Sequence, residues 1–442
     1  MTHGWEVTRL HPTRDEILPG VFLTCLQTDK FKTGVVSLNL LTPLTRENAA
    51  KNALIPSVLR RGTVRCPDMD ALAARLDSLY GARIEPIVRK LGEIQAVGFW
   101  ADFVDGAYLP DGGGSLLEDV IALLGEMLLS PVTRGGLLRR DYVDSEREKL
   151  LEDIRALAND KAAYSRQRLI ELMCAAEDYA VDALGTEDTA ESIRYVSLTK
   201  RYRALLAQSP IEIFYCGTAD FDRVRAALCD ALCTLPRGEL DDGIGTDVRM
   251  NRLEDDIRYH TESMDVTQGR LVLGYRLGAC MEEPDLAAIR VMNALFGGCP
   301  TSKLFMNVRE RLSLCYYAGS AVDVLKGVML VSCGIEPQNL DPALAEITHQ
   351  LDALRAGAVT PEELESAKRT LMSEYTAASD SIGQLESFWL GQNVQGLSYT
   401  PAEFAALIEG VTADDAAAVA RSVECDMVYF MYGEEDDADD EA

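Results

Sequence analysis

An internal repeat limits the folds open to this chain more than any other feature of its sequence. Short motifs of the first half recur in the second half in the same order. Three glycine pairs, Gly34 and Gly269, Gly62 and Gly297, and Gly92 and Gly327, share one identical offset, and the offset of Tyr80 and Tyr316 is greater by one position. A single match could arise by chance, but a consistent series indicates a duplicated unit.

Two further matches have smaller offsets. Ser145 matches Ser366, and the apolar segment 211–217 matches 427–433. A few loop deletions in the second half would produce this drift. Each copy therefore spans roughly 210 residues, which is enough to bury a core of its own.

Strand and helix signals alternate within the first copy. β-rich runs predict strands at 21–26, 35–41, 83–90, 93–101 and 211–215. Amphipathic patterns predict helices at 48–61, 69–79, 116–129, 141–159, 162–175, 200–207 and 222–233. We therefore expect an α+β protein with one helix-faced sheet in each copy. The expected domains are 1–234 and 263–433, joined by a polar linker at 235–262 and followed by an acidic tail at 434–442.

The charge and cysteine content narrow the functional classes. The net charge is −28, and seven acids lie in the last nine residues. Such a surface repels phosphate backbones and anionic lipids, so nucleic-acid and membrane partners are disfavoured. The sequence has no long apolar run and no secretory signal at its start, and its eleven cysteines are scattered. We expect reduced thiols and a cytoplasmic protein.

The histidines argue against a zinc site. There are only four, and no two of them lie within one helical turn. Zinc sites normally place two ligands at short spacing on one element, and no C-x2-C pair replaces the missing histidines. Cys229 and Cys233 are close together on a predicted amphipathic helix, where two core thiols are the simpler interpretation.

The most specific motif is the segment FGGCPTSKLFMNVRERLSLCY at 296–316. It combines a glycine pair, a Ser-x-Leu-Phe helix, Arg-Glu-x-x-x-Leu and a tyrosine. With the duplication and the stretches at 144–154 and 179–185, it makes the chain resemble the pitrilysin-type (M16) metallopeptidases from about residue 18 to residue 433. That family includes mitochondrial processing peptidase subunits and complex III core proteins. The resemblance implies two homologous domains, each a mostly antiparallel sheet faced by helices.

The family's zinc motif, H-x-x-E-H, is absent. Counting back from Gly62, its two histidines and its general base correspond to Ala53, Ser57 and Pro56. Alanine and proline offer no ligand or base, and a neutral serine is a poor zinc ligand. The third family ligand, a glutamate that follows Glu146 on the same helix, corresponds to Asp153, which has no companions. This half is not expected to hydrolyse peptides, and no metal is expected in this chain.

A second family feature is retained. Active members carry a spaced arginine and tyrosine that hold substrate and stabilise the oxyanion, and Arg309 and Tyr316 have the family's spacing. Alternatively, Arg309 pairs with a local acid and Tyr316 simply packs. Tyr317 replaces Tyr316 if the register is shifted by one position.

Two functions remain open from the sequence. The chain is either a non-catalytic subunit that supplies Arg309 and Tyr316 to a zinc-bearing M16 partner, or a scaffold or peptide-binding protein without a catalytic role. The first predicts a heterodimer acting on a peptide, with zinc only in the partner subunit and a possible homodimer when the chain is isolated.

Overall fold

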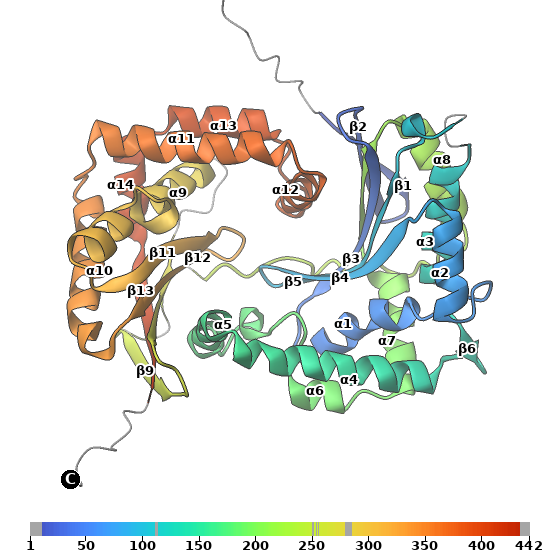
Figure 1. Ribbon diagram of the computed structural model, residues 1–442, viewed down its shortest axis with the longest axis horizontal. Coiled ribbons are helices and arrows are strands. Elements are labelled where there is room, and N and C mark those ends of the chain that lie inside the picture. The colour runs from blue at the N-terminus through green and yellow to red at the C-terminus, as the bar shows by residue number, and fades with distance from the viewer. Residues whose placement is uncertain are drawn as a thin grey trace, which may run out of the picture. The chain divides into compact units, whose positions relative to one another are not determined.

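The structure is a computed structural model that describes residues 11–110, 114–249, 252, 254, 256–278 and 285–433. The predicted acidic tail at 434–442 lies outside these residues. The chain forms two compact units, shown in Figure 1. Unit 1 comprises 1–155, 181–245 and 379–400, and unit 2 comprises 156–180, 246–378 and 401–442. Each unit therefore contains a segment from the other half of the sequence, whereas the predicted domains were continuous.

Unit 1 is built on a six-stranded sheet with the order β1-β2-β8-β3-β5-β4. Its strands are β1 (Thr13–Leu18), β2 (Val21–Gln27), β3 (Thr33–Pro43), β4 (Arg83–Leu91), β5 (Ile94–Val104) and β8 (Ile211–Gly217). All neighbours are antiparallel except β2 and β8. A short hairpin, β6 (Thr133–Arg134) and β7 (Leu137–Leu138), stands apart from the sheet.

Helices cover both faces of this sheet. They are α1 (Ala49–Leu59), α2 (Met69–Ser78), α3 (Leu116–Leu129), α4 (Arg140–Ala156), α6 (Glu187–Glu191), α7 (Tyr195–Gln208), α8 (Phe221–Ala231) and α12 (Ile382–Val394). The main core lies on one face, where Val36, Leu38 and Leu40 of β3 pack with residues of the helices of the first half. On the other face, Phe214 and Cys216 of β8 pack against α12. The sheet is therefore buried on both sides, which explains the long apolar runs of β3 and β8.

Within the residues that the structure describes, unit 2 repeats this sheet without a counterpart of β1. Its strands are β9 (Arg258–Ser263), β10 (Gly269–Arg276), β11 (Cys315–Asp323), β12 (Val328–Ile335) and β13 (Glu424–Tyr432), in the order β9-β13-β10-β12-β11. As with β2 and β8, only β9 and β13 are parallel. β9 overlaps the predicted linker, 235–262. The sequence of this strand, RYHTES, contains no apolar run from which a strand could be predicted.

The helices of unit 2 are α5 (Lys161–Met173), α9 (Asp285–Asn293), α10 (Leu340–Arg355), α11 (Pro361–Ala378), α13 (Pro401–Gly410) and α14 (Ala413–Ser422). Two π-helical stretches, Ala294–Gly298 and Leu304–Arg311, follow α9. α5 packs closely on β10 at Gly274. A Cβ atom at this position would lie 2.4 Å from the sulfur of Met173.

Matching strand orders confirm the predicted α+β architecture of two homologous, mostly antiparallel sheets. Gly34 and Gly269 lie on the equivalent strands β3 and β10. Gly92 and Gly327 form the equivalent hairpin turns, with φ of 60° and 70°. The pairing of Tyr80 with Tyr316 is wrong, because Tyr80 precedes β4 whereas Tyr316 lies within β11.

The segments that the two units exchange, 156–180 and 379–400, occupy equivalent positions in the two copies of the repeat. α5 begins at Lys161 and α12 begins at Ile382, and these two positions have the same offset as Ser145 and Ser366. Each segment carries a buried glutamate that pairs with an arginine of the sheet it covers. Glu386 of α12 lies 2.5 Å from Arg89 on β4, and Glu177, just after α5, lies 2.6 Å from Arg276 on β10.

In the described part of the chain, no helix has the length and apolar composition that crossing a bilayer requires.

Candidate functional site

The degenerate zinc positions of unit 1 lie on α1. Ala53 is buried with 3% of its surface exposed, Pro56 is buried within the helix, and Ser57 is half-buried. A methyl group, a pyrrolidine ring and one neutral hydroxyl cannot supply the nitrogen and carboxylate ligands of a zinc hydrolase. Among the described residues, no three His, Cys, Asp or Glu side chains are grouped to hold a metal ion. The family's zinc therefore does not fit these residues.

A buried hydrogen-bond network that the sequence did not indicate lies beside Ala53 and contains one charged residue, Arg201. The fully buried Asn52 donates to Oε1 of Gln95 at 2.7 Å and accepts from Nε of Arg201 at 2.6 Å. Arg201 also donates to Thr42 at 2.8 Å. Burial lowers the pKa of Arg201, but a guanidinium remains charged at any physiological pH. The network fixes α1 against β5, β3 and α7, so we assign it a structural role.

The predicted remnant ligand, Asp153, lies on α4 and is exposed. The buried acid of this helix is instead Glu146, whose Oε1 lies 3.0 Å from Arg61 and 2.9 Å from Lys149. Two cations therefore already neutralise the only carboxylate that α4 buries. The exposure of Asp153 is that of a solvated helix face.

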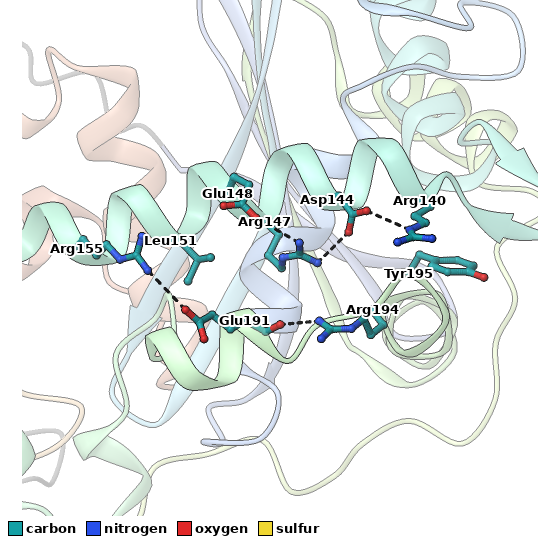
Figure 2. Close-up of a pocket in the computed structure, with 9 residues that line it drawn as sticks. All are labelled: Arg140, Asp144, Arg147, Glu148, Leu151, Arg155, Glu191, Arg194 and Tyr195. Atoms are coloured by element: carbon teal, nitrogen blue, oxygen red, sulfur yellow. Dashed lines mark hydrogen bonds and ion pairs between the residues drawn. The ribbon is translucent and has the colours of Figure 1, made fainter.

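A pocket of about 690 Å³ also runs along α4, as Figure 2 shows. It is lined by Arg140, Asp144, Arg147, Glu148, Leu151, Arg155, Glu191, Arg194 and Tyr195. The guanidinium of Arg147 lies 2.9 Å from Asp144, and Arg194 donates to the carbonyl of Glu191 at 2.6 Å. Asp153 does not line this pocket. Four arginines repel a metal cation, and the acids beside them are used in ion pairs.

Unit 2 brings the other two predicted residues together. Arg309 lies near the end of the π-helical stretch Leu304–Arg311, and Tyr316 is the second residue of β11. Both line one solvent-open pocket of about 380 Å³. The remaining lining residues are Glu310, Ser313, Leu314, Cys315, Glu336 and Asn339. We call this the Arg309 pocket.

A strained turn joins Arg309 to Tyr316. Ser313 has a φ of 50°, which residues other than glycine rarely adopt. Its backbone N–H donates to the carbonyl of Arg309 at 3.0 Å, and the N–H of Leu314 donates to the carbonyl of Val308 at 3.0 Å. The turn reverses the chain so that both ends of the segment face one pocket.

Arg309 has both a local acid and an aromatic neighbour. Its guanidinium lies 3.6 Å from Glu310 and 4.6 Å from the ring centre of Phe305. The side chains of Arg309 and Glu310 are 41% and 50% exposed, so this pair is a weak surface interaction. The local ion pair considered from the sequence exists, but it leaves the guanidinium accessible in the pocket.

Tyr316 is held by a residue that the sequence did not indicate. Its hydroxyl donates to Oε1 of Glu336 at 2.8 Å. This hydrogen bond and the charge of Glu336 raise the pKa of Tyr316, so the phenol stays protonated and able to donate. The residue is 62% exposed, which a purely packing role does not explain. Tyr317 does not line the pocket, and its ring lies under the guanidinium of Arg270 at 5.6 Å.

Comparison with known proteins gives a consistent set of relatives. A family profile described as "Peptidase M16 inactive domain" matches residues 192–371. A Bacillus subtilis (strain 168) protein described as "Probable inactive metalloprotease YmfF" is 31% identical over 418 residues, which cover 94% of this chain and 96% of that protein.

Solved structures agree. A conserved protein from Enterococcus faecalis V583 has a TM-score of 0.86 and 28% identity, covering 96% of this chain and 99% of that chain. A peptidase M16 inactive domain from Pseudomonas fluorescens has a TM-score of 0.76 over 96% of this chain and 98% of its own. Because the two sequences are only 15% identical, this similarity shows a shared fold and nothing further.

Proposed function

The chain belongs to the M16 peptidase family, as a member without the zinc motif, and from this premise we propose that it is the non-catalytic subunit of a two-chain zinc peptidase. One observation carries the proposal. The chain has no residues fit to hold zinc at Ala53, Pro56 and Ser57, yet it keeps Arg309 and Tyr316 in one solvent-open pocket. A chain with only a scaffold role has no need of that geometry.

In the proposed chemistry, this chain contributes only hydrogen-bond donors. Zinc, held by an H-x-x-E-H motif of the partner subunit, would supply the activated water. Arg309 offers a planar fork of N–H donors, and Tyr316 offers one hydroxyl, both suited to the negative charge that develops on a peptide carbonyl during attack. For this, the Tyr316 hydroxyl must exchange its bond to Glu336 for one to the substrate.

The substrate class follows from the same pocket. Its donors recognise backbone carbonyls, so we propose a peptide or an unfolded segment as the substrate. The scattered, unpatterned cysteines of the sequence support a cytoplasmic setting. The alternative function, a scaffold or peptide-binding protein, predicts that the pocket donors have no effect on any reaction.

The test is reconstitution with an H-x-x-E-H-bearing family protein of similar length from the same genome. Size exclusion of the mixture reports the complex, and the same measurement on the isolated chain reports any homodimer. We expect Arg309→Ala and Tyr316→Phe to lower kcat of the pair by about 10²–10³, with little change in complex formation.

Two neighbouring variants serve as controls. Arg311→Ala removes an exposed arginine that pairs with Glu346, and Tyr317→Phe removes a hydroxyl outside the pocket. Both should leave turnover unchanged. Equal turnover by all four variant pairs would reject the catalytic role and favour the scaffold function.

A further inference from the structure

Two cysteines meet at the base of the Arg309 pocket. Cys315 is the first residue of β11, and Cys333 lies on the neighbouring strand β12. Cys315 pairs with Ile335, and Cys333 pairs with Ala318. Because Cys333 and Ile335 alternate with Gly334 on one strand, Cys315 and Cys333 point to the same face of the sheet.

A bulge at Tyr316 interrupts the pairing of β11 with β12 next to Cys315. Pairing shifts between Cys315 and Tyr317, so Tyr316 is an extra residue on β11. In a regular ladder these two positions would be diagonal neighbours. The two thiols are close enough to shift each other's pKa, that of Cys315 downward and that of Cys333 upward. Both cysteines are free thiols in the structure.

The two thiols differ in their position relative to the pocket and in the direction in which their pKa is shifted. Cys315 lines the Arg309 pocket, whereas Cys333 is fully buried behind it. The hydrogen bond from Cys333 lowers the pKa of Cys315, burial opposes this, and the nearby charge of Arg309 adds to it. The same hydrogen bond and burial raise the pKa of Cys333. A pocket-lining thiol with a lowered pKa, next to a fully buried thiol with a raised pKa, resembles an attacking and a resolving cysteine.

We propose that Cys315 and Cys333 are a redox modification site, which a hydroperoxide converts into a disulfide between β11 and β12. The Cys315 thiolate attacks the peroxide. An S–O bond forms, the O–O bond breaks, and the leaving alkoxide or hydroxide takes up a proton. Cys333 then loses its proton as its sulfur attacks the sulfur of Cys315, an S–S bond forms, and water leaves. Two thiols and one hydroperoxide give one disulfide, one alcohol or water molecule, and one water molecule.

The disulfide would act on the pocket directly. It fixes Cys315, the residue next to Tyr316, to the strand that ends at Ile335. Glu336, which accepts the hydrogen bond from the Tyr316 hydroxyl, is the residue directly after that strand. Oxidation would therefore place a covalent link next to the Tyr316–Glu336 hydrogen bond. The modification itself does not depend on whether Arg309 and Tyr316 serve a partner subunit.

Peptide mapping of the intact chain tests the proposal. The folded protein is treated with limiting hydrogen peroxide or cumene hydroperoxide, blocked with iodoacetamide, denatured and digested with trypsin. Cleavage after Arg311, Lys326 and Arg355 places the two cysteines in separate peptides, 312–326 and 327–355. We expect these peptides to be joined, with the loss of two thiols per chain, and to separate on reduction.

The chain provides a matched control pair. Cys25 and Cys216 lie on the neighbouring strands β2 and β8, but they pair with Tyr215 and Leu26, so they point to opposite faces. Burial raises the pKa of each to about 12. Their peptides, 15–30 and 204–223, should stay separate.

Single variants separate the two steps. Cys333→Ser should leave Cys315 as a sulfenic acid that dimedone traps, and Cys315→Ser should give neither product. The exposed Cys233 provides a competing thiol whose oxidation verifies that the oxidant is active. The proposal is overturned if Cys233 oxidises while 312–326 and 327–355 remain separate, or if these peptides are joined only after the protein is unfolded.

Discussion

The variant Arg276→Met tests whether the buried charges of unit 2 hold the exchanged segment in place. Arg276 is fully buried, and its guanidinium donates to both oxygens of Glu177, at 2.6 and 3.1 Å, and to Asp426 at 3.0 Å. Methionine retains most of the apolar volume but none of the charge. The variant therefore leaves two buried carboxylates that each lose one cation.

The remaining contacts set the magnitude. Removing one partner of a buried ion pair usually costs about 3–5 kcal/mol. Here Glu177 keeps Lys326 at 2.8 Å, and Asp426 keeps Arg258 at 2.7 Å. Because each acid keeps one cation, we expect a loss at the lower end of that range, about 3 kcal/mol in the free energy of unfolding.

Urea titration followed by far-UV circular dichroism measures this loss. The control is Arg311→Met, which removes an exposed pair with Glu346 and should cost less than about 1 kcal/mol. The double variant Arg276→Met/Glu177→Gln should recover part of the loss, because it removes one of the two weakened charges. A loss below about 1 kcal/mol for Arg276→Met would show that the cluster does not fix the segment.

Three further predictions follow from the geometry. Ser313→Gly should raise the free energy of unfolding by about 0.5 kcal/mol, because relief of a positive φ outweighs the added chain entropy, and an unchanged urea midpoint would contradict this. For Glu177, burial alone would raise the pKa, but hydrogen bonds from Arg276 and Lys326 outweigh it and lower the pKa. The stability that Glu177 contributes is therefore present above its unfolded pKa of about 4.3 and is lost as pH falls through its folded pKa. In the variant Glu177→Gln, the free energy of unfolding should therefore decrease less steeply as the pH is lowered. The dialysed chain should bind no stoichiometric zinc by metal analysis, and one zinc per chain that is lost in Asp153→Ala would contradict this.

The predictable part of the fold is the part with strong apolar signals. The helix predicted at 116–129 matches α3 (Leu116–Leu129), and the hairpin around Gly92 matches β4 and β5. β1 was missed because half of its sequence, TRDEIL, is charged and the strand lies at a sheet edge. The exchange of α5 and α12 could not be predicted, since periodicity shows that a helix has an apolar face but not which sheet covers that face.

The same limit applies to the candidate site. The spacing of Arg309 and Tyr316 was available from the resemblance, and one turn of structure is enough to bring them together. Glu336 comes directly after β12, whereas Tyr316 lies on β11, and a single glutamate after a strand has no distinguishing pattern. Asn52, Gln95 and Arg201 were missed for the same reason, because each is an isolated polar residue whose partners come from distant elements.

The exchanged helices also explain why the buried charges occur where they do. An apolar helix covering an apolar sheet could bind either sheet of a duplicated protein, because both sheets have the same strand order. Glu386 is paired with Arg89 and accepts a hydrogen bond from Ser37, whereas Glu177 is paired with Arg276 and Lys326. A glutamate placed on the wrong sheet would be buried without its cation, at a cost of several kcal/mol. The buried ion pairs therefore favour one arrangement of two similar halves over the alternatives, which is the best attested use of buried charge in proteins.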